Sequence, residues 1–470
     1  MSTFSVPDVL AQGRWRSGDE LNAIASGWLG AVGAVGAGGG AVAVALPTTP
    51  EGVALLVGLS SLPSPLVLLP PDVRAWRTEP AIPPGSPLVL LSTLAHLAPD
   101  AEKLGLVPLV LPEASTRGGP PIEPFRGAGV VLFTSGSSGL PKPVFHRMDS
   151  EVAWVGNRIR SMGLAPGAGL VVGAPLAYAQ GFTHLLTAIL LGGPLGLLDP
   201  RDYRLALRTL AEPVFRCWRC TPHLVEAVAR CALTGPPVVP PVCIVSTPVA
   251  KGTFDAFVDR FGVPLRQTYS TTETGTITLD DSPVGHVQPD TVGRPLRQVD
   301  VRIGDSPFEP AAPGDLGRVW VRSPGLMQGY GFPPDLEPRA DVDGWWPTQD
   351  LGRLRSDGYL VLGGRRDDAI RTRDNRTVNL AYVAERLREI DRVADAAVVA
   401  VDTPSGQSFG AVVEHEPGLT LGDIQGWLAD TLPPWSRPRV LALVLALPRL
   451  PNGKPDRQAC VRLLAEAASA

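Results

Sequence analysis

One stretch of the chain combines glycine, hydroxyl side chains and a lysine in a pattern that suits phosphate binding. It follows directly on the apolar run 129–133 and consists of Thr134, Ser135, Gly136, Ser137, Ser138, Gly139, Leu140, Pro141 and Lys142. Small residues let several backbone N–H groups point into one concavity, the hydroxyls add donors, and Lys142 adds a positive charge. The stretch therefore predicts a loop that cradles the phosphates of a nucleotide.

Two other interpretations of this stretch stay open. It lacks the spacing of a Walker A loop, in which Lys and Ser or Thr directly follow the second glycine. A run rich in serine and glycine also forms ordinary surface turns. In addition, it resembles part of the amidase-signature hydrolases, with Ser137 or Ser138 as the nucleophile of a serine amidase, although the elbow pattern Gly-x-Ser-x-Gly does not fit.

Four later segments also carry side chains that could do chemistry. They are residues 269–273 (Tyr-Ser-Thr-Thr-Glu), 343–350 (Asp-Gly-Trp-Trp-Pro-Thr-Gln-Asp), 358–368 and 451–457 (Pro-Asn-Gly-Lys-Pro-Asp-Arg). Taken alone, each has a plain structural explanation: a polar junction between strand and loop, a turn-capping aspartate, or a lysine at a solvated loop tip.

Together and in this order, the five segments resemble the motifs of the AMP-forming adenylating superfamily. That family includes acyl- and aryl-CoA synthetases, peptide-synthetase adenylation domains and beetle luciferases. The resemblance runs from about Ala25 to Arg457. It implies an AMP-forming ligase that uses ATP and Mg²⁺ to convert a carboxylic acid to an acyl-adenylate, with release of pyrophosphate.

The resemblance also implies roles around the nucleotide. The loop residues Thr134 to Gly139 and Lys142 would bind the phosphates. Tyr269 would pack against the adenine, Thr272 would contact the α-phosphate and Glu273 would hold Mg²⁺, a hard cation that prefers carboxylate oxygen. Ser270 stands where the family usually has glycine. Further adenine contacts would come from the segment that stands in place of the family's Gly-Gly-Ala/Ser loop. This segment matches the family pattern only weakly and consists of Ser246, Thr247 and Pro248.

The last three motifs supply the ribose contacts, a hinge and a catalytic cation. By the resemblance, Asp350 accepts hydrogen bonds from both ribose hydroxyls, and Arg365 contacts ribose or phosphate. Asp367 is the hinge about which the C-terminal domain turns. Lys454, on its Pro-x-Gly-Lys loop, neutralises the negative charge that grows during adenylation.

Residues 175–182 stand where the family places an aromatic gate at the acyl pocket. Within them Tyr178, Gly181 and Phe182 are predicted to contact the substrate acid, although Tyr178, at the position of a common histidine, could equally be a packing aromatic. Residues 175–182 contain no Phe-Asp pair of the kind that binds an α-amino group. We therefore expect an aromatic or modest aliphatic acid.

The acceptor of the acyl group is less clearly marked. Asp374 stands where CoA-forming relatives usually have a glycine beside the pantetheine tunnel, and a carboxylate there would narrow or re-aim the tunnel. Transfer to a thiol, either CoA or a separate carrier protein, is the first prediction. An amine acceptor and a nucleotide-binding pseudoenzyme are the alternatives, with the serine amidase as a distant one.

Short apolar runs between helix-like segments predict an α/β core with mainly parallel strands. The predicted strands are 41–46, 65–69, 88–91, 107–111, 129–133 and 242–245, with half-exposed strands at 299–303 and 317–322. The predicted helices of this part are 21–35 and 53–62. The last segment predicts helices at 381–390 and 421–431 and strands at 396–401 and 440–447.

With the resemblance, this pattern predicts two domains. Residues 1–366 would form a large N-terminal adenylation core of helix-flanked sheets and a distorted β-barrel. Residues 367–470 would form a small mobile α+β lid that carries the catalytic lysine.

Composition excludes several other classes of protein. The chain has 470 residues, 44% of them hydrophobic and 19% charged, with a net charge of −4 and no basic block. We therefore expect no nucleic-acid partner. The N-terminus lacks a secretory signal, and the uncharged run 21–50 is too rich in glycine and alanine for a membrane span.

The cysteines indicate the compartment. There are five, an odd number, at 217, 220, 231, 243 and 460. They predict buried thiols in a reducing cytoplasm, and the Cys-x-x-Cys pair at 217–220 has no second pair that would complete a metal site. A homodimer is kept open as the oligomeric state.

Overall fold

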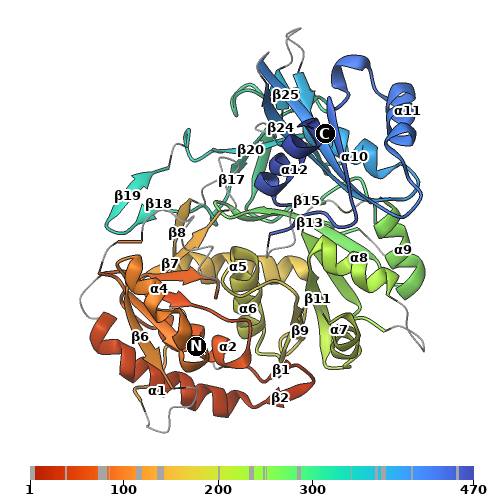
Figure 1. Ribbon diagram of the computed structural model, residues 1–470. Coiled ribbons are helices and arrows are strands. Elements are labelled where there is room, and N and C mark those ends of the chain that lie inside the picture. The colour runs from red at the N-terminus through yellow and green to blue at the C-terminus, as the bar shows by residue number, and fades with distance from the viewer. Residues whose placement is uncertain are drawn as a thin grey trace. The chain divides into compact units, whose positions relative to one another are not determined.

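The computed structural model (Figure 1) describes most of the chain. The described residues are 6–36, 40–71, 82–83, 85–112, 119–134, 142–199, 202–231, 238–246, 249, 251–282, 287–339, 341–365, 369–371, 377–403, 406–450 and 455–469.

The chain forms two compact units, a large N-terminal one and a smaller C-terminal one. The large unit comprises residues 1–300 and 321–346, and the small unit comprises 301–320 and 347–470. Both contain helices and sheets, so the predicted α/β class with two domains of unequal size is confirmed. The chain passes between the units more than once, because residues 321–346 return to the large unit.

A nine-stranded sheet forms one half of the large unit. Its strands, in spatial order, are β15 (Arg294–Pro295), β14 (Gly275–Leu279), β13 (Leu265–Thr271), β12 (Val242–Ser246), β11 (Phe215–Cys220), β9 (Gly169–Val172), β10 (Leu195–Leu197), β1 (Val9–Ala11) and β2 (Arg14–Arg16). The six strands from β13 to β1 are parallel, and antiparallel strands complete both edges.

An eight-stranded sheet forms the other half. In spatial order it contains β19 (Asp335–Pro338), β18 (Gly329–Phe332), β8 (Pro143–Arg147), β7 (Gly129–Phe133), β4 (Leu66–Leu69), β3 (Val42–Ala45), β5 (Pro87–Leu91) and β6 (Val107–Leu111). Its central strands β3, β4 and β7 are buried along their whole length. Continuous apolar strands of this kind suit a parallel sheet covered on both faces.

Helices cover both sheets. Those of the large unit are α1 (Gly18–Gly36), α2 (Pro50–Leu59), α4 (Ala98–Lys103), α5 (Met148–Met162), α6 (Ala179–Leu191), α7 (Tyr203–Leu210), α8 (Pro222–Arg230) and α9 (Lys251–Phe261), with a 3₁₀ turn η1 (Ser92–Leu97). Helix α5 packs against β7 and β8 on one side and β14 on the other, while α6 packs against α5 and β9 (Figure 1). These two helices therefore fill the space between the sheets.

The outer face of the nine-stranded sheet holds an apolar core. Helices α8 and α9 pack against β12 and β13 there. Trp218 of β11 is fully buried, and its ring centroid lies 6.1 Å from that of Phe257 in α9. Apolar burial of this kind is the main stabilising term of a fold.

The small unit is built from three sheets. They are a four-stranded sheet of β16 (Asp300–Ile303), β17 (Gly317–Arg322), β20 (Trp346–Leu354) and β21 (Leu360–Arg365), the pair β22 (Ala369–Arg371) and β23 (Thr377–Asn379), and a three-stranded sheet of β24 (Val393–Thr403), β25 (Gly406–His415) and β26 (Val440–Val444). Its helices are α10 (Leu380–Arg388), α11 (Leu421–Thr431) and α12 (Arg457–Ser469), with a 3₁₀ turn η3 (Pro434–Ser436).

Most predicted elements are present, with shifts at their ends. Helix α2 begins at Pro50, three residues before the predicted start, because the Thr49 hydroxyl caps it by accepting a hydrogen bond from the Gly52 backbone N–H at 3.1 Å. The predicted helix 421–431 matches α11. Strand β25 and helix α12 were not predicted, although the apolar run Ala411-Val412-Val413, with its two β-branched valines, is typical of a strand.

The hydropathy of the helices is a separate finding. Within the part of the chain that the structure describes, no helix combines the length and the apolar character needed to cross a bilayer.

Gly275, directly after the turn that carries Thr272 and Glu273, is required by close packing. It has a φ of +67°, and a Cβ there would lie 2.4 Å from Nε1 of the buried Trp154. We expect Gly275→Ala to lower the free energy of unfolding by about 1–3 kcal/mol more than Gly262→Ala. Gly262 is the matched control because it has a similar φ of +63° and open space around the Cβ position. Equal shifts of the urea midpoint in the two variants would contradict this packing account.

Candidate functional site

The predicted site residues of the large unit gather at one edge of the nine-stranded sheet. Strands β9, β11, β12 and β13 are parallel neighbours, so their carboxyl ends meet at the same edge. Tyr178 follows β9, Ser246 ends β12, and Thr272 and Glu273 follow β13. This edge of an open parallel sheet is where α/β proteins bind ligands.

The predicted phosphate loop joins the antiparallel strands β7 and β8. Of this loop, Ser135, Gly136, Ser137, Ser138 and Gly139 lie outside the described residues. Its two ends are paired: the Thr134 N–H donates to the Lys142 carbonyl at 3.0 Å, and the Lys142 N–H donates to the Thr134 hydroxyl oxygen at 3.2 Å. The residues on either side of the loop are therefore held together at the end of the hairpin.

Tyr330 connects the end of this loop to the turn after β13. Its hydroxyl donates to Glu273 Oε1 at 3.1 Å, and Lys142 Nζ lies 5.4 Å from the centroid of its ring. The Glu273 carbonyl also accepts a hydrogen bond from the Met327 N–H at 2.8 Å. Strand β18 places Tyr330 because it pairs with β8, with Tyr330 opposite Val144. Lys142 and Glu273 thus meet at one tyrosine, which the sequence analysis missed.

His146 holds the carbonyl group of the same turn. Its Nε2 lies 2.8 Å from the Thr272 carbonyl oxygen, and its Nδ1 lies 3.0 Å from Glu151 Oε1. The side chains of His146 and Glu151 are almost fully buried. Since a carbonyl oxygen and a carboxylate can only accept hydrogen bonds from the ring, the doubly protonated imidazolium fits both contacts.

The charge on His146 follows from its neighbours. Burial by itself would lower the pKa of His146, but the negative charge of Glu151, the hydrogen bond to it and the Thr272 carbonyl together raise that pKa above its ordinary value. The turn that carries Thr272 and Glu273 is therefore held by a buried cation. Sequence reasoning missed His146, and its position on β8 gave no local signal of this contact.

The predicted acid gate lies at the start of α6. Tyr178 is half-buried, whereas Phe182 is fully buried with its ring edge-on to Phe125, at a centroid separation of 6.5 Å. Gly181 is also buried, and a Cβ there would lie 2.0 Å from the Pro175 carbonyl oxygen, so only glycine fits. The contacts of Tyr178, Gly181 and Phe182 with an acid stay predictions.

Gln180 links this gate to the predicted adenine segment. Its side-chain amide donates to the Ser246 hydroxyl oxygen at 3.0 Å and to the Cys220 carbonyl at 3.4 Å. Tyr269 is buried in β13, and its N–H donates to the Thr278 hydroxyl oxygen at 3.3 Å. Thr247 and Pro248 lie outside the described residues.

The predicted ribose contacts lie in the small unit. Asp350 on β20 and Arg365 on β21 are directly opposite each other in an antiparallel pair. The Asp350 side chain is half-buried, and its N–H donates to the Thr348 hydroxyl oxygen at 3.2 Å. Three other predicted residues, Asp367, Asp374 and Lys454, lie outside the described residues. The structure thus brings predicted residues together within each unit.

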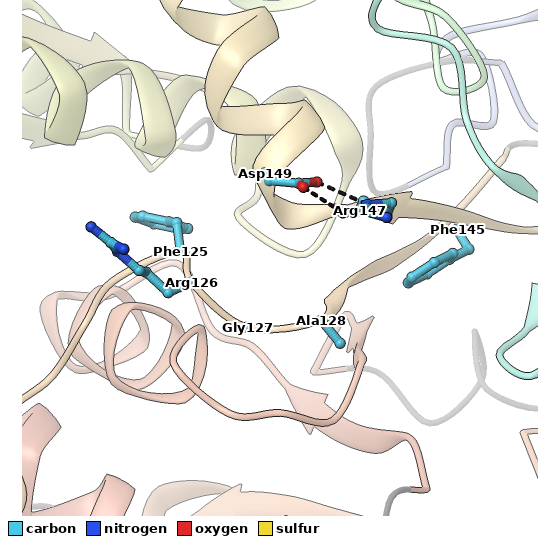
Figure 2. Close-up of a pocket in the computed structure, with 7 residues that line it drawn as sticks. All are labelled: Phe125, Arg126, Gly127, Ala128, Phe145, Arg147 and Asp149. Carbon is cyan, nitrogen blue, oxygen red and sulfur yellow. Dashed lines mark hydrogen bonds and ion pairs between the residues drawn. The ribbon is translucent and has the colours of Figure 1, made fainter.

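A separate pocket of about 470 Å³ lies elsewhere in the large unit (Figure 2). Figure 2 shows Phe125 and Arg126 on one side and Phe145 on the other, with Arg147 and Asp149 joined by an ion pair where α5 begins. Arg147 pairs with Gly129, at the end of the β7–β8 hairpin opposite to Thr134 and Lys142. That separation is roughly 16 Å along the strands, so the Arg147 end of this pocket lies away from the described ends of the predicted phosphate loop.

The cysteines behave as structural thiols. Cys217, Cys220, Cys243 and Cys460 are buried, and Cys231 is half-buried. Burial raises the pKa of Cys217 to about 12 and the pKa of Cys460 to about 11. A thiol with so high a pKa is a poor nucleophile and metal ligand at neutral pH.

Glu273 suits a magnesium ion that is shared with phosphates. Among the described residues, no group of three or more His, Cys, Asp and Glu side chains could hold a metal ion by itself. Protein sites for Mg²⁺ that also bind nucleotide commonly provide one or two carboxylates, and phosphate oxygens and water complete the coordination. The half-exposed carboxylate of Glu273, beside the end of the predicted phosphate loop, fits this donor set.

Comparison with known families gives two matches. The family described as AMP-binding enzyme matches residues 12–331, and the family described as AMP-binding enzyme C-terminal domain matches residues 383–454.

Individual relatives are more distant. Novobiocin biosynthesis protein H of Streptomyces niveus is 28% identical, over 96% of this chain and 79% of its own length. A second relative is a CoA ligase of Rhodococcus jostii that is named for a propanoyl group bearing a methyl-dioxo-octahydroindenyl ring. It is 29% identical over 69% of this chain and 63% of its own length. Gramicidin S synthase 2 of Aneurinibacillus migulanus is 25% identical over 70% of this chain, which spans only 8% of that protein.

Among solved structures, the amide bond synthetase McbA of Marinactinospora thermotolerans is similar over nearly its full length. The TM-score is 0.81 and the identity 26%, with 98% of this chain and 97% of that chain covered.

The buried pair of His146 and Glu151 predicts a pH-dependent contribution to stability. Because the folded-state pKa of His146 is raised, the contribution is full below the unfolded histidine pKa of about 6.5 and is lost as the pH rises through the folded-state pKa. The difference in free energy of unfolding between wild type and His146→Gln should therefore shrink as the pH rises. Urea unfolding across a pH series measures this difference.

His96→Gln is the matched control, because His96 is an exposed histidine of the same unit. Its curve should run parallel to the wild-type curve. A His146→Gln curve that is equally parallel would show that folding does not raise the pKa of His146.

Proposed function

Because this chain belongs to the AMP-binding enzyme family, we propose that it activates a small carboxylic acid with MgATP, forming an acyl-adenylate and releasing pyrophosphate. The observation that carries the proposal is the junction at Tyr330, where Glu273 and Lys142 meet beside the ends of the predicted phosphate loop. One carboxylate and one lysine beside a loop of small and hydroxyl residues suit a magnesium–phosphate group.

In the proposed reaction a carboxylate oxygen of the acid attacks the α-phosphorus of ATP. The bond between the α-phosphorus and the bridging oxygen breaks, and pyrophosphate leaves with the electron pair. No proton has to move, so the chain's residues act by positioning and by charge stabilisation. Lys142 and residues 134–139 hold the phosphates, and Thr272 contacts the α-phosphate.

Further predicted residues have roles in the proposed reaction. Glu273 holds Mg²⁺, which when bound neutralises phosphate charge. Tyr330 orients the Glu273 carboxylate, and His146 fixes the turn on which Thr272 and Glu273 lie. Ser246, Thr247, Pro248 and Tyr269 surround the adenine. Asp350 and Arg365 bind the ribose, and their directly opposed positions on β20 and β21 support this pairing.

Lys454 supplies the positive charge for adenylation. It lies on a Pro-Asn-Gly-Lys segment that reaches the acid and the α-phosphate when residues 367–470 turn about Asp367. The domain boundary at residue 367 and the hinge at Asp367 are part of this proposal.

The acyl group then passes to a thiol, either CoA or a separate carrier protein. An amine acceptor is the second candidate, and the likeness to an amide bond synthetase over nearly the whole chain favours it. Asp374 at the usual glycine position also argues against an open pantetheine tunnel. The acid itself is aromatic or modestly aliphatic.

The test is the exchange of labelled pyrophosphate into ATP with a broad panel of acids. Exchange that depends on the acid supports adenylation and excludes a serine amidase, which needs no nucleotide. Binding of AMP with no exchange for any acid would instead support a nucleotide-binding pseudoenzyme. Mass spectrometry of products formed with CoA, carrier protein or amines then identifies the acceptor.

Lys454→Ala should lower the exchange rate by about a hundredfold or more, because it removes one preorganised charge from the transition state. ATP binding, measured by calorimetry, should stay close to that of wild type. Lys251→Ala is the matched control, because Lys251 is an exposed lysine paired with Asp255 on the surface of α9. Exchange by Lys454→Ala at the wild-type rate would refute the role given to this lysine.

Tyr330→Phe removes the hydroxyl that orients Glu273 and keeps the ring under Lys142. We expect the Mg²⁺ concentration that gives half-maximal exchange to rise by about three- to tenfold, in line with the loss of one hydrogen bond of ordinary net strength at a half-exposed carboxylate. The KM for the acid should change little. An unaltered magnesium requirement would mean that Tyr330 does not orient the metal ligand.

A further inference from the structure

The inner face of the nine-stranded sheet holds polar side chains where a core would be apolar. They come from α5, α6, β11 and β14 and form what we call the buried arginine cluster, namely Arg158, Thr183, His184, Thr187, Arg219 and Thr276. Arg158, Arg219 and His184 are only 3%, 2% and 1% exposed. Charged side chains are almost never buried this deeply unless they are paired.

The arginines of this cluster contact neutral groups. Arg158 donates to the Thr276 hydroxyl at 3.3 Å, to the Thr183 carbonyl at 2.7 Å and to the Thr187 hydroxyl. Arg219 Nε donates to His184 Nε2 at 3.0 Å, so His184 is neutral and carries its proton on Nδ1. Among the described residues, no carboxylate forms an ion pair with either guanidinium. Glu151, the carboxylate whose charge acts on the pKa of Arg158, is bound to His146.

Three nitrogen atoms of the cluster are buried without a hydrogen-bond partner in the part of the chain that the structure describes. They are Arg158 Nε, Arg219 Nη1 and His184 Nδ1. All three are donors, so the group as a whole lacks an acceptor. Buried donors are normally satisfied, and two cations among them favour an acceptor with negative charge.

The charge balance points the same way. Burial and then the positive charge of Arg219 lower the pKa of Arg158 to about 9. Burial also lowers the pKa of Arg219. An anion bound between them would offset both effects, because an opposite charge at close range favours the charged form.

The cluster is continuous with the predicted acid gate. On α6, positions 180, 183, 184 and 187 lie on one face because they are three and four residues apart. Gln180 at the start of that face contacts the Cys220 carbonyl, directly after Arg219 in β11. One polar stripe therefore leads from the gate residues, past Gln180, to His184 and Arg219.

Strand register places Arg219 away from the predicted phosphate site. Arg219 is aligned with Ile244 and through it with Arg266, five residues before Thr271 in β13. At about 3.3 Å per residue, this is roughly 16 Å along the sheet. This separation is between backbone positions, and the long Arg219 side chain and the acid span it together. The reacting carboxylate belongs at the phosphates, so Arg219 is suited to the far end of the acid.

From this arrangement we infer that the acid which this chain activates carries a second carboxylate, held at its far end by Arg219 and Arg158 with His184 as an additional donor. The inference rests on the proposed function, since it names the class of acid for the same site. The second carboxylate undergoes no reaction. It accepts hydrogen bonds from the cluster and supplies its missing negative charge.

The first experiment uses the wild-type protein. Straight-chain and aromatic dicarboxylic acids are each compared with their half-amides in the pyrophosphate exchange assay. A half-amide has the same length and nearly the same shape but is neutral at the far end. At the best chain length, we expect kcat/KM for the dicarboxylic acid to exceed that for its half-amide by about tenfold or more.

The second experiment changes the cluster. In Arg219→Gln, kcat/KM for the dicarboxylic acid should fall by about ten- to a hundredfold, while the half-amide and the KM for ATP change little. Arg219→Lys should restore part of the preference. The matched control is Arg260→Gln on α9, because Arg260 donates to the Ala229 carbonyl away from the cluster. It should keep the wild-type preference.

The outcomes separate the two proposals. If the half-amides support pyrophosphate exchange with the same kcat/KM as the dicarboxylic acids, this inference is overturned and the proposed function is left intact. An Arg219→Gln protein that loses stability but keeps the ratio between acid and half-amide also overturns it. Absence of exchange with every acid overturns the proposed function and this inference with it. If Arg219→Gln does not fold, the wild-type comparison still decides.

Discussion

The hydrogen bond from His146 to the Thr272 carbonyl is the contact on which the large unit's site depends. It joins β8 of the eight-stranded sheet to the turn between β13 and β14 of the nine-stranded sheet, across 126 positions of sequence. Glu151 stands behind it, almost fully buried with the histidine. Removing one partner of a buried charge pair is costly because the other stays unpaired, so the turn and its carboxylate have one strongly preferred position.

The two faces of the nine-stranded sheet divide stability and recognition between them. In β11, Trp218 and Cys220 belong to the apolar core under α7 to α9, whereas Arg219 turns toward α6. The apolar face contributes the burial that stabilises the fold. The polar face costs free energy, since three of its buried donors lack partners among the residues that the structure describes. Other parts of the fold, such as the apolar face, therefore offset the free energy that the polar face costs. Proteins commonly show this compensation around binding sites.

Much of the architecture could be predicted from local pattern. The runs 65–69 and 129–133 lack polar alternation and form buried strands, and the AMP-forming resemblance is confirmed by the family match. The run 107–111 has the same apolar pattern, which predicts a buried strand, but it forms the partly exposed edge strand β6, so this prediction was wrong. The site's supporting residues could not be predicted. His146, Tyr330 and Arg219 gain their meaning from contacts with Thr272, Glu273 and His184, which are distant in sequence. The periodicity of apolar residues indicates which face of a helix or strand a residue occupies, but it does not indicate which residue of another element contacts it.

The late pairing of β18 with β8 has a consequence for biosynthesis. Strand β8 ends at Arg147, but β18, which covers its free edge, begins only at Gly329. Roughly 180 residues must leave the ribosome in between, which takes about ten to forty seconds at ordinary translation rates. During that interval an apolar strand edge is open to pairing with other chains. The nascent protein thus has a defined period of vulnerability to aggregation, which ends when Tyr330 arrives and the edge is closed.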